Sequence, residues 1–243
     1  MGLKIDKQRD RGDLLNMVRQ VAVNAGMKIA DVQESTIMLP ILLVNGIPYY
    51  ELGLDGKKPS QDGKFVADSL ILNKNDAFVA HEIGFYATKA KIVGGKESLG
   101  NALFYSYIDE NVWAAGAGAE AEDMNALFGA RLSFQTNQDV RREDIPCRDF
   151  WAPPVTQRNL TNKTLPSGPL HTVGLDSSLV YQGGQNNMVK VVMTGTNGAI
   201  TPTAPTTAGY CNVAVVVMKG HLVKGGNETS FLEKWVEYTS AKY

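Results

Sequence analysis

Apolar and polar residues follow two different periods along this chain, and each period predicts a different kind of element. Between Asp13 and Gly26 the apolar residues recur every three or four positions, as on one face of an amphipathic helix. Gly26 is well placed to end that helix, because glycine readily adopts the left-handed conformation found after a helix. Near the other end, Ser230-Phe231-Leu232-Glu233 matches a capping box and predicts a terminal helix.

Between these helices, short apolar or alternating segments are separated by turns rich in Gly, Asn and Pro, which is typical of strands. Asn45-Gly46 predicts a hairpin between the first two strands, and the turn at 73–76 predicts a second one. A short helix is expected over 122–129. The predicted strands cover residues 36–44, 47–52, 64–72, 77–88, 90–93, 103–108, 131–136, 140–151, 170–181, 188–194 and 210–219.

About ten strands, with helices only near the ends and around residue 124, argue against alternating βαβ units and for an antiparallel sandwich or barrel. We therefore expect a mainly β protein with three parts: an N-terminal helical arm over 1–30, a β domain over 31–225 and a C-terminal helical tail over 226–243. A chain of 243 residues is long enough to bury a full-sized core.

Composition narrows the classes of function. The chain is 44% hydrophobic and 20% charged, as in a folded globular protein, and its net charge is -1. A chain so close to neutral has no overall basic field, so we expect no specific nucleic-acid partner. The first six residues lack the apolar core of a signal peptide, and the apolar stretch 37–44 is too short to span a bilayer. We expect a protein that is not secreted; contact with a membrane stays open.

Each motif that could carry chemistry is incomplete. His81-Glu82 begins like a zinc-protease helix motif, but Phe85 stands where the second histidine ligand is required. Residues 116–121 match only half of a dinucleotide fingerprint, and Cys147 lies in no recognised nucleophile context. We predict no catalytic residue, no cofactor and no metal, and therefore a protein that is not an enzyme.

One longer pattern resembles a known family. Predicted strands at 78–86, 103–112 and 130–135 precede Pro153-Pro154-Val155-Thr156-Gln157, and a later strand runs into a Gly-Gly-Gln-Asn-Asn turn at 183–187. Over about residues 64–220, this succession resembles bacteriophage virion proteins of the jelly-roll kind. The N-terminal helix and the Ala/Gly-rich run 114–121 depart from it.

The resemblance implies a jelly-roll sandwich or barrel, either single or compact double. It also implies a virion structural protein, in the first place a major capsid subunit, made in the host cytoplasm and located in the virion. Its partners would be copies of itself, in a trimer or a larger symmetric assembly, and other virion proteins. We expect the terminal helices to contact neighbouring subunits. The candidate assembly contacts are Leu14, Val18, Val21, Phe231, Trp235 and Tyr238.

Two other functions remain open. Aromatic residues such as Tyr49, Tyr50, Trp113 and Trp151 could form a stacking platform for sugars, as in a monomeric carbohydrate-binding β-sandwich. Alternatively, the three histidines at 81, 171 and 221 could converge inside a barrel, as in the metal site of a cupin-like enzyme. Sugar binding without self-assembly would favour the first function, and stoichiometric metal in the purified protein would favour the second.

Overall fold

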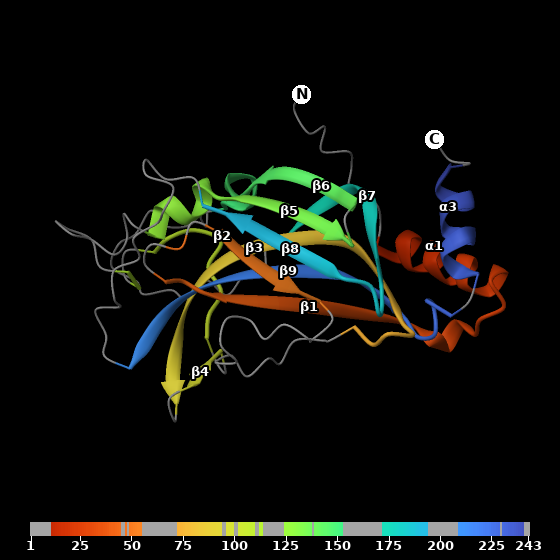
Figure 1. The fold of residues 1–243 in the computed structure, drawn as a ribbon, viewed down its shortest axis with the longest axis horizontal. Coiled ribbons are helices and arrows are strands. Elements are labelled where there is room, and N and C mark those ends of the chain that lie inside the picture. The colour runs from red at the N-terminus through yellow and green to blue at the C-terminus, as the bar shows by residue number, and fades with distance from the viewer. Residues whose placement is uncertain are drawn as a thin grey trace.

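In the computed structural model, most of the chain forms two antiparallel β-sheets that pack face to face, with two helices at one end (Figure 1). The protein is therefore mainly β and has the layers of a β-sandwich. The structure describes residues 11–44, 47, 49–54, 72–93, 96–99, 102–109, 112–113, 124–137, 139–152, 172–193, 209–228 and 230–240.

The larger sheet has five strands in the order β1-β9-β3-β4, and β7 also pairs with β3. Its centre is β9, where every residue from Asn212 to Met218 is buried because both faces of the strand are covered. The strands are β1 (Val32–Leu42), β3 (Ala77–Val93), β4 (Lys96–Ser98), β7 (Val173–Gln182) and β9 (Tyr210–Val223).

The smaller sheet has four strands in the order β2-β8-β5-β6. On β5, buried residues alternate with exposed or half-buried ones, so one face points to the interior and the other outward. The inward faces of both sheets meet in one apolar core, which includes Phe85 and Val216 from the larger sheet and Phe134 and Val191 from the smaller one. The strands are β2 (Tyr49–Gly53), β5 (Arg131–Thr136), β6 (Asp139–Pro146) and β8 (Asn187–Val192).

The two predicted helices are confirmed. Helix α1 (Arg11–Asn24) is followed by Gly26, whose φ of 81° is the left-handed conformation expected after a helix. Helix α3 (Phe231–Ser240) lies beside α1 at one end of the sandwich (Figure 1). Both helices pack on the outer face of the larger sheet, in an apolar group that we call the helix-facing cluster: Val18, Val21, Ala22, Val32, Ala77, Val79, Val223, Phe231 and Trp235.

The hairpin predicted at Asn45-Gly46 is wrong. Strand β1 pairs with β9 along its full length, and β2 pairs with β8 in the other sheet, so β1 and β2 do not form a hairpin. The turn residues Asn45 and Gly46 themselves lie outside the described residues. A turn signal fixes only a few local residues, whereas β9 offers β1 a partner at eleven positions from Val32 to Leu42. Of the second predicted hairpin, the turn at residues 73–76 and the strand after it are present, but 64–71 lie outside the described residues.

Three further segments differ from prediction. Residues 103–108 form only an isolated bridge, between Ala87 and Tyr105, although their burial alternates as in a strand. The segment 140–151 is split, because β6 ends at Pro146 and a 3-10 helix, η3 (Cys147–Phe150), follows. In the segment predicted as a helix near residue 124, residues 126–129 form the 3-10 helix η2 (Ala126–Gly129). One more 3-10 helix, η1 (Ile29–Asp31), precedes β1.

Candidate functional site

Most of the six predicted assembly contacts lie inside the chain's own fold. Helices α1 and α3 turn these side chains toward the larger sheet, where they cover Ala77, Val79 and Val223. Four of the six belong to the helix-facing cluster and Tyr238 packs against it, whereas Leu14 is not part of it. Contact with another subunit stays a prediction for all six. Val18, Val21, Phe231 and Trp235 are buried, and Leu14 and Tyr238 are half-buried.

A β-bulge in β3 brings a group of polar and charged side chains together on the outer face of the larger sheet. Ala80 lies opposite Gly220 and Glu82 lies opposite Lys219, so His81 is the extra residue. A bulge turns two successive side chains to one face of a sheet, and here it turns His81 and Glu82 outward, away from the core between the sheets. We call His81, Glu82, Thr172, Lys219, His221 and Arg19 the bulge cluster.

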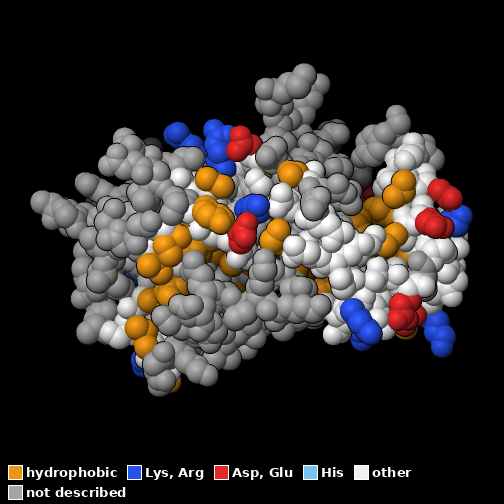
Figure 2. Space-filling model, in the orientation of Figure 1, with side chains coloured by type: hydrophobic (Ala, Val, Ile, Leu, Met, Phe, Trp, Pro, Cys, Tyr) orange, Lys and Arg blue, Asp and Glu red, His pale blue; other side chains and the backbone are white. Residues whose placement is uncertain are grey.

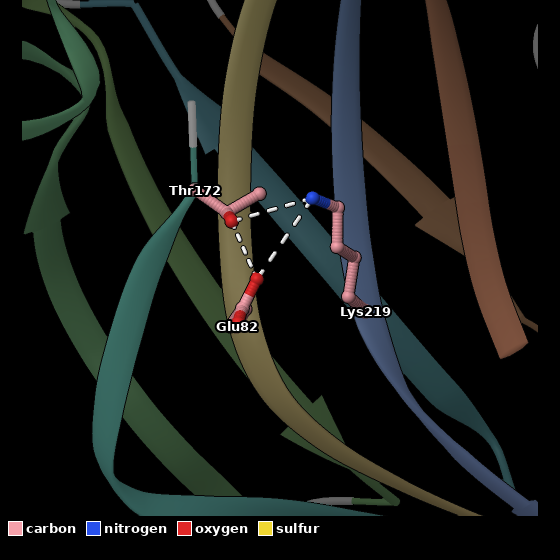
Figure 3. A network of polar contacts seen from close by, with 3 residues as sticks. All are labelled: Glu82, Thr172 and Lys219. Carbon is pink, nitrogen blue, oxygen red and sulfur yellow. Dashed lines mark hydrogen bonds and ion pairs between the residues drawn. The ribbon is translucent and has the colours of Figure 1, made fainter. Parts of the chain in front are cut away.

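Within the bulge cluster, the side chains of Glu82, Thr172 and Lys219 contact one another and so connect β3, β7 and β9 (Figure 3). The Thr172 hydroxyl, next to the start of β7, donates a hydrogen bond to Glu82 Oε2 at 2.5 Å. Lys219 Nζ on β9 lies 3.9 Å from the same oxygen and 3.5 Å from Thr172 Oγ1. The side chains of Glu82 and Lys219 are only 17% and 21% exposed, so their charges compensate each other in a largely buried position.

The other part of the bulge cluster is a pair of stacked imidazole rings, His81 and His221, which lie under α1. The His81 and His221 ring centroids are 5.0 Å apart, and both residues are buried. Burial, followed by the neighbouring His81 and Arg19, lowers the pKa of His221 from its ordinary 6.5 to about 4. Two atoms of this group, His221 Nδ1 and Arg19 Nε, are buried without a hydrogen-bond partner in the structure.

The position of the histidines bears on the metal chemistry considered above. His221 lies between Gly220 and Leu222, and Leu222 points into the core between the sheets, so alternation turns His221 outward beneath α1. His81 and His221 therefore do not line the interior of the sandwich, and His171 lies outside the described residues. In the described part of the chain, no group of three or more His, Cys, Asp or Glu residues is arranged to hold a metal ion.

The aromatic residues considered as a sugar platform separate into two groups. Tyr50 and Trp113 are buried, and Trp113 Nε1 donates a hydrogen bond to Asn212 Oδ1 at 3.0 Å within the core. Tyr49 and Trp151 are exposed, by 52% and 48%. They lie at different places in the chain, on edge strand β2 and just after η3.

The outer face of the four-stranded sheet is the second exposed surface of interest. Tyr49 and Val192 lie opposite each other on β2 and β8, and both are exposed. Two residues further along the same strands, Lys190 Nζ lies 3.1 Å from Glu51 Oε1. Figure 2 shows apolar side chains gathered over this part of the molecule, with an acidic and a basic side chain among them. The surface therefore combines apolar contact area with charges that are already paired.

No protein-family model matches this sequence, and no curated protein is significantly similar to it. In the described residues, no helix has the length and apolar character needed to cross a membrane.

Sequence reasoning missed the bulge cluster. Two successive polar residues, His81-Glu82, interrupt the apolar run of β3, and such an interruption is the local signal of a bulge. Their partners Thr172, Lys219 and His221 come from segments far away in the chain. Only the pairing of β3 with both β7 and β9 brings them together, so the cluster could not be found without the topology.

Proposed function

We propose that the sandwich is a single jelly roll. With β4 set aside as a short addition, the other eight strands in the described residues pair first with eighth, second with seventh, third with sixth and fourth with fifth. Such pairing is what a long hairpin produces when it is rolled up into two sheets, and the rolled hairpin is the design of the jelly roll. The four pairs that support this assignment are β1 with β9, β2 with β8, β3 with β7, and β5 with β6.

On this fold we propose a virion structural protein, in the first place a bacteriophage major capsid subunit that assembles with copies of itself. The observation that carries the proposal is the rolled pairing of the eight strands, because viral capsid domains are among the main users of that design. It agrees with the sequence resemblance over residues 64–220. The role is structural rather than catalytic, and the location that follows is the virion.

Exposed apolar side chains on two separate surfaces provide a physical basis for assembly. Tyr49 and Val192 lie on the outer face of the smaller sheet, whereas Val23 and Val236 lie on α1 and α3 at the end of the sandwich. Val236 is 61% exposed. A subunit of a closed shell must contact several neighbours through different surfaces, and apolar side chains within a polar surround are the usual core of such contacts.

The two competing functions find less support in the geometry. A cupin-like enzyme would need its histidines inside the barrel, and His81 and His221 point away from it. A carbohydrate-binding module keeps one favourable observation, the exposed rings of Tyr49 and Trp151. Glycan binding by a stable monomer would favour that module over a capsid subunit.

The test is the mass of the purified full chain by light scattering, followed by negative-stain microscopy. We expect rings, trimers or shells well above the 26.4 kDa of one chain. A monomer that persists at high concentration and in neutral buffers of differing salt would refute self-assembly. Val192→Asp and Val236→Asp examine the two surfaces separately, because a charge buried in a contact weakens association by several kcal/mol.

Asn125→Asp is the control, since it adds the same charge at an exposed position next to η2 and replaces none of the exposed apolar residues of the two surfaces. We expect the assembled fraction to fall at least tenfold in one or both valine variants and to stay unchanged in the control. Circular dichroism of all three variants checks that the β fold is intact. If both valine variants assemble like the unchanged chain, these surfaces are not the contacts.

A further inference from the structure

The bulge cluster lies where α1 meets the larger sheet, directly beside the helix-facing cluster. His221 stands opposite Val79, which belongs to that apolar group, and Arg19 comes from the middle of α1. The helices are held by an apolar group that is separate from the core between the sheets. A change at the histidines can therefore act on the helices without acting on the sandwich.

We propose that the stacked His81–His221 pair is an acid-sensitive latch: proton uptake by the pair releases α1 and α3 from the sheet while the sandwich stays folded. This inference does not depend on the proposed function. It rests on three geometric facts, namely the ring stacking at 5.0 Å, the burial of both histidines, and the buried Arg19 Nε and His221 Nδ1 atoms that lack a hydrogen-bond partner.

The charges around the pair explain why a proton is disfavoured while the helices are docked. Arg19 on α1 is positive near His221, and a proton on one ring adds a like charge beside the other ring. Glu82 on β3 accepts from Thr172 and pairs with Lys219 on β9, so its charge is already compensated. On β1, Glu34 lies opposite His221 but is exposed, where water screens its attraction.

The other two elements at this site add no compensating charge that the structure describes there. From β7, Val180 packs against the helix-facing cluster. From α3, Phe231 and Trp235 face the sheet, while Lys234 and Glu237 pair with each other at 2.8 Å on the solvent side. A protonated His221 thus meets apolar side chains, the neighbouring imidazole and Arg19. Hydration of the new charge requires water to enter, and water enters when α1 moves away.

The sign of the pH dependence follows from the lowered pKa of His221. In the docked state His221 takes up a proton only near pH 4, whereas in the released state it does so near its ordinary pKa of 6.5. Docking is therefore fully favoured above about pH 6.5 and is weakened progressively as the pH falls toward 4. At pH 4.5 the docking equilibrium is expected to be roughly 10- to 100-fold weaker than at pH 7.5.

Hydrogen exchange with mass spectrometry on the full chain tests the latch, with rates corrected for the intrinsic effect of pH. Between pH 7.5 and 4.5 we expect peptides from α1 and α3 to lose protection about 10-fold or more, and peptides from β5 and β8 to keep theirs. Unchanged protection of both helices would overturn the proposal. So would a simultaneous loss in helices and strands, because that is unfolding of the whole domain.

Variants separate the latch from other acid effects. His81→Gln with His221→Gln removes both titrating rings, and α1 should then keep the same protection at both pH values. Glu51→Gln on β2 is the control: it removes a titratable side chain from the smaller sheet, on which neither helix packs, and it should respond like the unchanged chain. If the double variant does not fold, Arg19→Gln replaces it: without the neighbouring charge, release should need a lower pH. An α1 response that is identical in all the variants that fold would refute a role for the histidine pair.

Discussion

Replacement of Gly220 by alanine should strongly destabilise the larger sheet, because a single added methyl group there meets the backbone of β3. Gly220 lies opposite Ala80, at the edge of the bulge between β3 and β9. A Cβ atom on Gly220 would be 2.0 Å from the carbonyl oxygen of Val79 and 2.9 Å from Ala80 Cα. Backbone carbon and oxygen atoms in neighbouring strands normally lie about 3.3 Å apart. The two strands would have to separate by about 1 Å, because both obstacles are backbone atoms.

The cost of Gly220→Ala can be estimated from two contributions. Overpacking in a well-filled interior costs about 1–3 kcal/mol. Distorting one or two ladder hydrogen bonds at the bulge costs about 1 kcal/mol each. We therefore expect the free energy of unfolding to fall by about 2–5 kcal/mol. For a chain of this size, that lowers Tm by about 10 °C.

Urea unfolding followed by tryptophan fluorescence measures the change, and Gly174→Ala is the matched control. Gly174 lies in the same sheet on β7 and is exposed, and a Cβ atom there meets nothing within 4 Å. The control should therefore change the free energy of unfolding by no more than about 0.5–1 kcal/mol. Equal stabilities of the two alanine variants would refute the close approach of β3 and β9 on which the bulge depends.

Three further predictions concern other contacts. Asn227 Nδ2 donates hydrogen bonds to the carbonyl oxygens of two neighbouring turns, at 2.7 and 2.8 Å. Asn227→Asp should therefore lower the free energy of unfolding, measured in urea at pH 7, by about 2–3 kcal/mol. An effect below about 0.5 kcal/mol would contradict this role. Trp113→Phe removes the indole N–H that donates to Asn212, and it should lower the free energy of unfolding by about 1–3 kcal/mol in the same assay. An unchanged free energy of unfolding would disprove the importance of this hydrogen bond. Burial raises the pKa of the Cys147 thiol, so iodoacetamide should modify the half-buried Cys211 first; faster labelling of Cys147, read by mass spectrometry, would overturn this.

Local patterns were sufficient for the elements whose residues contact their own neighbours in sequence. The α1 helix follows the apolar spacing after Asp13 and ends before Gly26, as expected from short-range rules. Strand β5 occupies residues 131–136, as its alternation predicted, because one of its faces is buried and the other is not. These features need no knowledge of which strand is the partner.

Strand pairing and the bulge cluster could not be predicted in this way. Asn45-Gly46 is a strong local turn signal, yet β1 and β2 belong to different sheets, because each pairs with a strand from a distant part of the chain, β9 and β8. His81 and His221 looked like unrelated strand residues until the pairing of β3 with β9 brought their rings into contact. The burial of Val18 and Trp235 also depends on tertiary structure, since an apolar helix face does not reveal whether its partner belongs to the same chain.

The pairing of the first strand with the last has a consequence for biosynthesis. Val32 on β1 lies opposite Val223 on β9, and β9 also separates β1 from β3. While the chain emerges from the ribosome, β1 has to wait for its partner until β9, which lies far along the chain, has been made. Long-range closure of this kind folds slowly, and waiting strands expose unpaired edges. A chain that stops before residue 210 lacks the centre of its larger sheet, so we expect prematurely terminated copies to be recognised as unfolded and degraded.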